Sequence, residues 1–269
     1  MAGRLLVEEP GLAPILLGGR AIGSEGPIFI AGPCAIESEE QAIRIARRVK
    51  AAGAIAFRGG AFKPRTSPYS FQGLGERGLA ILEVVRRETG LLICTEALDV
   101  DCFDAVRRVA DIVQIGSRNM SHSSLLKRAG RCGKPVLLKR GFAATLDEFL
   151  HAAEYVVAGG NRDVMLCERG IRTFCSHSRN TLDLQAVLAL RARTSLPVIV
   201  DPSHAAGRRS DVLPLSCAAA AVGAEGVLVE VHDRPDEALC DGDQAILPET
   251  FVELVDRVRL VSKLRCAGR

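Results

Sequence analysis

The chain has 269 residues, of which 48% are hydrophobic and 25% charged, a composition typical of a globular protein and unlike that of disordered or fibrous chains. Its formal net charge of +3 and its aromatic content of 4%, without tryptophan, do not favour a nucleic-acid or membrane partner. Length alone allows one domain or two, since α/β barrels of about 250 residues form a single unit.

The cysteine pattern and the N-terminus predict the compartment. The nine cysteines are odd in number and include no C-x-x-C spacing, which indicates a reducing environment. The apolar stretch at 5–7 is too short for a signal peptide, and no run of about 18 apolar residues is present to span a bilayer. We therefore expect a cytoplasmic protein.

Residues 1–26 precede the first clear β pattern. Within them, the segments 15–17 and 20–22 flank Gly18 and Gly19, and consecutive glycines suit the positive φ angles of a tight hairpin turn. We expect an N-terminal β-hairpin extension that closes the bottom of the fold. A disordered tail is the alternative, because chain termini are often poorly ordered.

From residue 27 onward, short aliphatic or β-branched runs alternate with longer segments of helical period. The eight runs are 27–31, 54–57, 91–95, 111–115, 135–139, 163–167, 197–200 and 226–231. The clearest helical segments are 38–52, with Ser38 as N-cap, 145–159, 180–193 and 248–264. Each run is apolar on both faces, as expected of a parallel strand covered by helices.

Eight strand–helix units without a linker between them predict an α/β fold of the (β/α)8 TIM barrel type, which occupies residues 27–269 as one catalytic domain. An open, doubly wound sheet is less consistent with this pattern, and no G-x-G-x-x-G motif follows the first run.

Polar and charged residues follow these runs, at the ends where barrel enzymes carry their chemistry. Six of them are cations that suit carboxylate and phosphate groups: Arg58, Lys63, Arg65, Arg118, Lys139 and Arg169. The alternative is internal pairing with Glu96, Glu168 and Asp201, which is common for a single arginine but improbable for all six cations. We expect an anionic ligand here.

A second set of residues at this end suits a metal. In a closed barrel the last strand lies beside the first, so Cys34, His204, Glu230 and Asp241 converge although they are far apart in sequence. A thiolate, an imidazole and two carboxylates suit a divalent transition metal. Their spacing alone is a weak signal, since single buried cysteines and histidines are more often structural.

Eight segments together resemble one enzyme family. They read GPCAIES (32–38), FRGGAFKPRTSPYSFQGLGERGL (57–79), TEALD (95–99), QIGSRN (114–119), KPVLLKRGF (134–142), ERGIRTF (168–174), VDPSHAAGRR (200–209) and EVHDRPDEALCDGDQ (230–244). In this order they resemble 3-deoxy-D-arabino-heptulosonate 7-phosphate (DAHP) synthase, in its short-barrel class I beta branch without a regulatory domain.

The resemblance implies a condensation of phosphoenolpyruvate with erythrose 4-phosphate and water that yields DAHP and phosphate, the first step of the shikimate pathway. It assigns a divalent metal (Mn, Fe, Co or Zn) to Cys34, His204, Glu230 and Asp241. It places phosphoenolpyruvate at Arg58, Lys63, Ser117, Arg118, Lys139 and Arg169, and the aldose phosphate at Lys63, Pro64, Arg65 and Thr66.

The chemistry accounts for these residue types. A metal beside the aldehyde polarises it for attack by the weakly nucleophilic enol phosphate, and cations stabilise the departing phosphate. Lys139 either donates a proton there or only clamps the phosphate, and Lys63 is the other candidate catalytic lysine. Glu96 either orients the attacking water or, as we favour, braces an arginine.

The resemblance also implies a homo-oligomer, either a dimer or a tetramer. Ser117 stands where alanine is usual in the family, a change that should be tolerated. Without room for a regulatory domain, we expect catalysis by this chain alone to be unaffected by phenylalanine or tyrosine, although a regulatory partner could act in trans.

Two alternative functions remain. The related 3-deoxy-manno-octulosonate 8-phosphate synthase uses arabinose 5-phosphate, but its members resemble Lys-Ala-Asn-Arg at the position where this chain has Lys-Pro-Arg-Thr, at 63–66. The other alternative function is that of a non-catalytic barrel that only binds phosphorylated metabolites. Such a protein would not need a metal beside the aldehyde.

Overall fold

The computed structural model describes residues 5–63 and 67–267, and within these ranges eight parallel strands close into a barrel. They are β3 (Ile28–Gly32), β4 (Ala56–Arg58), β5 (Leu92–Ala97), β6 (Ile112–Ile115), β7 (Val136–Lys139), β8 (Val164–Glu168), β9 (Val198–Val200) and β10 (Gly226–Glu230). The barrel is closed by parallel pairing of β10 with β3, from Gly226 opposite Ile28 to Glu230 opposite Gly32. The predicted TIM barrel is confirmed.

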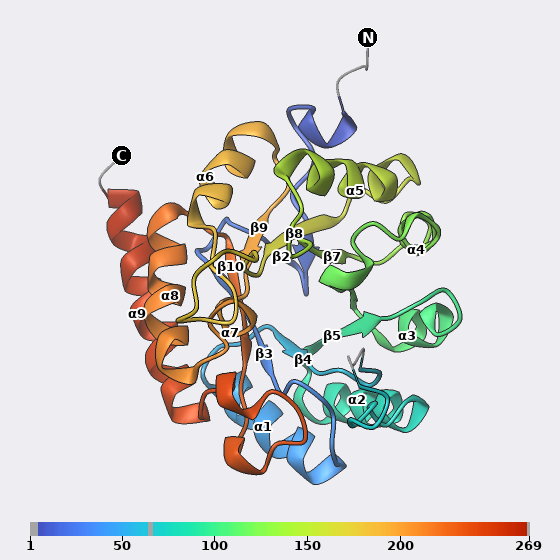
Figure 1. The fold of residues 1–269 in the computed structure, drawn as a ribbon, viewed down its shortest axis with the longest axis vertical. Coiled ribbons are helices and arrows are strands. Elements are labelled where there is room, and N and C mark those ends of the chain that lie inside the picture. The colour runs from blue at the N-terminus through green and yellow to red at the C-terminus, as the bar shows by residue number, and fades with distance from the viewer. Residues whose placement is uncertain (1–4, 64–66, 268–269) are drawn as a thin grey trace.

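Helices surround the strands on the outside (Figure 1), with α8 and α9 packed side by side. They are α1 (Glu39–Ala51), α2 (Glu76–Thr89), α3 (Phe103–Val109), α4 (Ser123–Ala129), α5 (Leu146–Ala158), α6 (Leu184–Arg193), α7 (Pro202–Ala206), α8 (Arg209–Val222) and α9 (Pro248–Ala267). Short 3-10 turns are η1 (Leu6–Glu8), η2 (Ser117–Asn119), η3 (Pro235–Glu237) and η4 (Gly242–Gln244).

Local caps decide where the predicted helices begin. The hydroxyl of Ser38 accepts a hydrogen bond from the Gln41 amide at the start of α1, as predicted. Helix α6 begins at Leu184, later than the sequence pattern predicts, because the Asp183 carboxylate caps it by accepting a hydrogen bond from the Ala186 amide.

The predicted N-terminal hairpin is present as β1 (Leu16–Leu17) and β2 (Arg20–Ala21), which pair in antiparallel fashion. Gly18 and Gly19 have φ angles of 58° and 83°, which the turn requires. Buried side chains on and beside this hairpin pack into the cluster that fills the lower barrel interior, which includes Ile28 and Ile30 of β3. The hairpin therefore shares a core with the barrel, and its separation at residue 26 as a distinct part stays a prediction.

The barrel interior changes from apolar to polar toward the carboxyl ends of the strands. The lower interior holds Ala56, Cys94, Ile112, Leu137, Cys167, Ile199 and Leu228. Because side chains in a strand alternate between faces, the position two residues later on each strand path also points inward: Arg58, Glu96, Gln114, Lys139, Arg169, Asp201 and Glu230. The barrel interior therefore has a polar layer at the carboxyl ends of the strands and an apolar layer below it.

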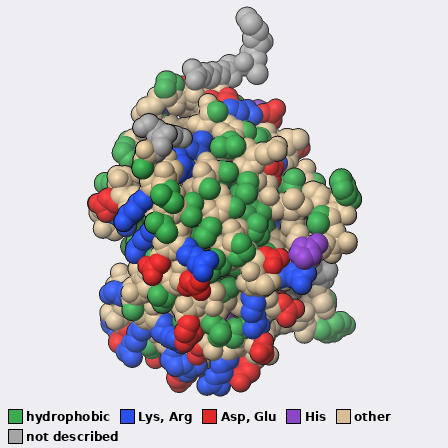
Figure 2. All heavy atoms as spheres, turned by 90° about the vertical axis from the view of Figure 1, so that its left-hand side faces the viewer, with side chains coloured by type: hydrophobic (Ala, Val, Ile, Leu, Met, Phe, Trp, Pro, Cys, Tyr) green, Lys and Arg blue, Asp and Glu red, His purple; other side chains and the backbone are tan. Residues whose placement is uncertain are grey.

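Figure 2 shows the side of the molecule formed by α8 and α9, where hydrophobic side chains gather near the centre of the face. Exposed apolar residues on α9 are Val252, Leu260 and Leu264, and Leu188 is exposed on the neighbouring α6. Among the described residues, no helix is long and apolar enough to cross a membrane.

Candidate active site

A cleft of about 230 Å³ opens at the carboxyl ends of the barrel strands. The structure brings nine of the predicted site residues to its lining: Arg58, Lys63, Glu96, Ser117, Arg118, Lys139, Arg169, His204 and Asp241. Pro64, Arg65 and Thr66, predicted to hold the aldose phosphate, lie outside the described residues.

The cations of the cleft fall into two groups. Arg58 donates a hydrogen bond to Glu230 at 2.7 Å, and Lys139 pairs with Asp201, so internal pairing accounts for part of their charge. Within residues 5–63 and 67–267, Arg118 and Arg169 form no ion pair with a carboxylate. Two guanidinium groups at the cleft therefore have no direct carboxylate partner among the described residues, which favours an anionic ligand.

A buried polar atom supports the same conclusion. Arg58 is only 4% exposed, and its Nε has no hydrogen-bond partner in the described part of the chain. Since unpaired buried donors are costly and rare in native proteins, this atom indicates a place for an acceptor from a ligand.

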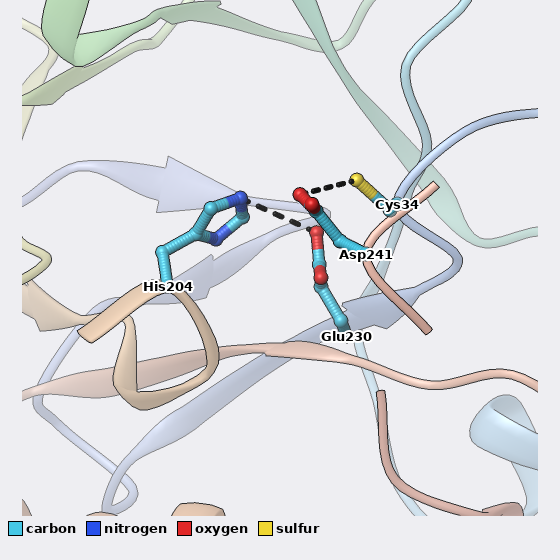
Figure 3. Close-up of side chains that lie close together, drawn as sticks. All are labelled: Cys34, His204, Glu230 and Asp241. Carbon is cyan, nitrogen blue, oxygen red and sulfur yellow. Dashed lines mark hydrogen bonds and ion pairs between the residues drawn. The ribbon is translucent and has the colours of Figure 1, made fainter. Parts of the chain in front are cut away.

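The four predicted metal ligands lie close together (Figure 3), with one donor atom from each within 4.8 Å of the others, and two of them, His204 and Asp241, also line the cleft. Cys34 Sγ is 3.3 Å from Asp241 Oδ2, and His204 Nε2 is 3.3 Å from Glu230 Oε1. One sulfur, one imidazole nitrogen and two carboxylate oxygens are the donors of a borderline divalent metal. The residues present therefore fit such an ion.

Barrel closure explains how these residues meet. Cys34 follows β3, Glu230 ends β10, and these two strands are neighbours. His204 lies on α7 directly after β9, which is the other neighbour of β10. Asp241 comes from the loop before η4, with a φ of 53° that non-glycine residues seldom adopt.

Partners behind the ligands orient them. Nδ1 of His204 lies 2.7 Å from Asp201 Oδ2, which leaves Nε2 facing the cluster, the usual carboxylate–histidine–metal arrangement. The Gln244 side-chain amide donates to Glu230 Oε2 at 2.7 Å and accepts from Arg179 at 3.0 Å. The loop that carries Asp241 is held at Leu239, whose amide donates to Glu37 Oε1 at 2.9 Å.

Electrostatics suit a bound cation. Burial would raise the pKa of Glu230, but positive charge on His204, Arg58 and Lys63 outweighs it and lowers the pKa to about 2. The hydrogen bond with Cys240, burial and the charge of Glu230 raise the pKa of Cys34 well above its usual value. A thiolate at Cys34 therefore needs nearby positive charge, which Lys63 Nζ, 3.0 Å from the sulfur, and a metal would both supply.

Glu96 has a different partner from the one expected. Its Oε2 accepts a hydrogen bond from Gln114 Nε2 at 2.9 Å, and among the described residues it forms no ion pair with an arginine. Gln114 therefore holds Glu96 in place, while the action of Glu96 on water stays a prediction.

Sequence reasoning missed several residues that line the cleft or support it: Gln114, Phe142, Arg179 and Gln244. Gln114 could have been found, because it lies two positions beyond the inward-facing Ile112. Phe142 and Arg179 lie in loops and Gln244 in the three-residue turn η4, where no periodic pattern reports the direction of a side chain.

Comparisons with known proteins agree with the sequence motifs. A family model described as the DAHP synthetase I family matches residues 13–263. The phospho-2-dehydro-3-deoxyheptonate aldolase of Thermotoga maritima is 51% identical over 243 residues, which cover 90% of this chain and 72% of that protein. The 2-dehydro-3-deoxyphosphooctonate aldolase of Magnetococcus marinus is 34% identical over 255 residues, which cover 88% of each chain.

Two solved structures have the same fold. The crystal structure of the Thermotoga maritima DAHP synthase matches with a TM-score of 0.94 at 48% identity, over 98% of this chain and 78% of that one. A truncated form of the 3-deoxy-D-arabino-heptulosonate 7-phosphate synthase of this organism matches with a TM-score of 0.88 at 45% identity, over 95% and 94%. The chain therefore belongs to the DAHP synthetase I family.

Proposed function

We propose that this chain catalyses the condensation of phosphoenolpyruvate with erythrose 4-phosphate and water to give DAHP and phosphate. The observation that carries the proposal is one cleft whose lining includes two members of the four-residue metal-type cluster, His204 and Asp241, and two guanidinium groups, those of Arg118 and Arg169, that form no ion pair in the described part of the chain. The first suits activation of an aldehyde and the second suits a phosphorylated carboxylate.

Phosphoenolpyruvate would bind at the cations of the cleft. Arg58 and Lys63 are buried beside the metal cluster, while Arg118 and Arg169 lie at the ends of β6 and β8. Guanidinium groups hold carboxylate and phosphate oxygens in pairs, so this arrangement would orient the enol carbon of bound phosphoenolpyruvate. Ser117, at the same cleft, offers a hydroxyl donor.

The aldose phosphate would bind at Pro64, Arg65 and Thr66 together with Lys63. This assignment is supported by the sequence alone. Lys63 Nζ contacts both Cys34 O and Cys34 Sγ, at 3.1 and 3.0 Å, so one end of the segment starts beside the metal cluster.

Cys34, His204, Glu230 and Asp241 would hold a divalent Mn, Fe, Co or Zn ion, which when bound acts as a Lewis acid on the aldehyde oxygen. The residues of the chain supply the remaining steps. Lys139 carries its ammonium group at the cleft, held by Asp201, where it can stabilise or protonate the phosphate that leaves C2. Positioning of both substrates in one cleft lowers the entropic cost of their reaction.

The octulosonate synthase reaction, with arabinose 5-phosphate, is the second candidate. The greater identity to the heptonate aldolase than to the octonate aldolase, and the Lys-Pro-Arg-Thr sequence at 63–66, favour erythrose 4-phosphate. A non-catalytic sensor would need the cations but not the metal cluster.

The test is release of phosphate from phosphoenolpyruvate with erythrose 4-phosphate or arabinose 5-phosphate, before and after chelation and with single metals added back. We expect turnover with erythrose 4-phosphate that chelation abolishes and a divalent metal restores. Preference for arabinose 5-phosphate would support the second candidate, and turnover with neither sugar under any metal would exclude the enzyme hypothesis.

We also infer a homo-oligomer, a dimer or tetramer. Three apolar residues of α9 are exposed and support this inference: Val252, Leu260 and Leu264. Sedimentation equilibrium of the purified chain tests it, and a monomer at micromolar concentration would contradict it.

A further inference from the structure

Phe142 lies in the loop after β7, half-buried, on the lining of the cleft. The guanidinium carbons of three arginines surround its ring. The distances to the ring centroid are 4.6 Å for Arg169, 5.3 Å for Arg172 and 5.8 Å for Arg118. All three are within the range of about 6 Å in which a cation is attracted to an aromatic face.

These three arginines lack the usual partner of a clustered cation. In the described part of the chain, none of them forms an ion pair with a carboxylate. Like charges so close together repel one another, and Arg169 is only 3% exposed, so water does little to screen it. Burial lowers the pKa of Arg169, and the charge of Asp201 offsets only part of that effect. The ring of Phe142 supplies compensating electron density without carrying a charge.

The position of the ring follows from strand order. β7 lies between β6 and β8 in the barrel, so the loop after β7 stands between Arg118, after β6, and Arg169, after β8. The Phe142 carbonyl also accepts a hydrogen bond from the Arg172 amide at 2.7 Å, which ties this loop to the segment after β8.

We propose that Phe142 is a positioning residue that holds the guanidinium groups of Arg118 and Arg169 ready for the phosphate of phosphoenolpyruvate. A carboxylate in its place would also hold them, but it would compete with the substrate anion for the same donors. An uncharged ring orients the arginines and leaves their charge available. This inference rests on the proposed function, because the proposed function identifies phosphoenolpyruvate as the anion that the arginines bind.

The test compares Phe142→Leu, which removes the ring face, with Phe142→Tyr, which keeps it. Phe174→Leu is the matched control, because Phe174 is fully exposed in the segment after β8. The measurements are KM for phosphoenolpyruvate, kcat, and the inhibition constant of inorganic phosphate. For Phe142→Leu we expect KM and the inhibition constant to rise about tenfold, from the loss of two cation–π contacts, with kcat within about twofold of wild type. Phe142→Tyr and Phe174→Leu should match wild type.

Several outcomes would overturn the inference: an unchanged KM in Phe142→Leu, an equal loss in Phe142→Tyr, or a fall in kcat at constant KM. Melting temperatures are measured first, and Phe142→Met takes the place of the leucine variant if that one does not fold. Calorimetric binding of inorganic phosphate gives a readout without turnover. If wild type fails to turn over but Phe142→Leu still binds phosphate more weakly, the proposed function fails and the positioning role of Phe142 stands.

Discussion

Gln244 offers the sharpest test of the metal cluster, because it contacts a ligand without being one. Its amide donates to Glu230 Oε2 at 2.7 Å, and the two side chains are 2% and 0% exposed. The substitution Gln244→Leu keeps the size of the side chain but leaves that carboxylate oxygen without its donor. A hydrogen bond to a buried charge contributes about 1.5–3 kcal/mol, and about 1.4 kcal/mol corresponds to tenfold in an equilibrium constant. We therefore expect the dissociation constant for a divalent metal to rise about 10- to 100-fold, the usual range for partners behind metal ligands.

Cobalt is a suitable probe for this test, since a Co²⁺ ion bound to the Cys34 thiolate gives a charge-transfer absorption band. Titration of the metal-free chain, followed by absorbance and by calorimetry, measures the dissociation constant without any need for turnover. Gln185→Leu, at an exposed glutamine on α6, is the control for the loss of an amide. An unchanged dissociation constant in Gln244→Leu, at an unchanged melting temperature, would refute the reasoning.

Three further predictions use other parts of the chain. Cys34→Ala should abolish turnover and the cobalt–thiolate band, because it removes the single sulfur donor of the four-residue cluster. Full activity of this variant in the phosphate-release assay would contradict the prediction. Native iodoacetamide treatment should modify exposed Cys175, whose pKa is lowered by backbone hydrogen bonds from the His177 and Ser178 amides, so that its thiolate persists to lower pH. Buried Cys94, with a pKa raised by burial to about 12, should be spared, as peptide mass spectrometry will show. Leu17→Ala, at a position 4% exposed at the barrel bottom, should lower the free energy of unfolding by about 2–5 kcal/mol; a loss below about 1 kcal/mol in a denaturant titration would show that the hairpin contributes little.

Much of the fold could be predicted because strand and helix patterns depend on residues that are close together in the sequence. Eight apolar runs of strand length, separated by helical segments, leave few arrangements besides a barrel. The positions that point into the barrel also follow from the sequence, because strand side chains alternate. This rule places Arg58, Lys139 and Glu230 in the polar layer, each two residues beyond an inward-facing apolar residue.

The long motifs allowed a prediction for the site, but the contacts within it required the structure. Glu96 is paired with Gln114 rather than with an arginine because β5 and β6 pair with Glu96 opposite Gln114. Phe142, in a loop, and Gln244, in the short turn η4, were missed because such segments have no period, so the directions of their side chains depend on how the segment packs against other parts of the barrel.

The sequence by itself therefore determined the strands, the main helices, the Ser38 cap, the glycine turn of the hairpin and the inward-facing positions, since each depends on residues close together in the chain. Tertiary structure alone decided which charges are paired and which stay available. Arg58 meets Glu230 across the closed barrel, while Arg118 and Arg169 meet at the ring of Phe142. Coulomb energy and hydrogen bonding depend on distance in space, and barrel closure sets the distance between residues that the chain itself holds far apart.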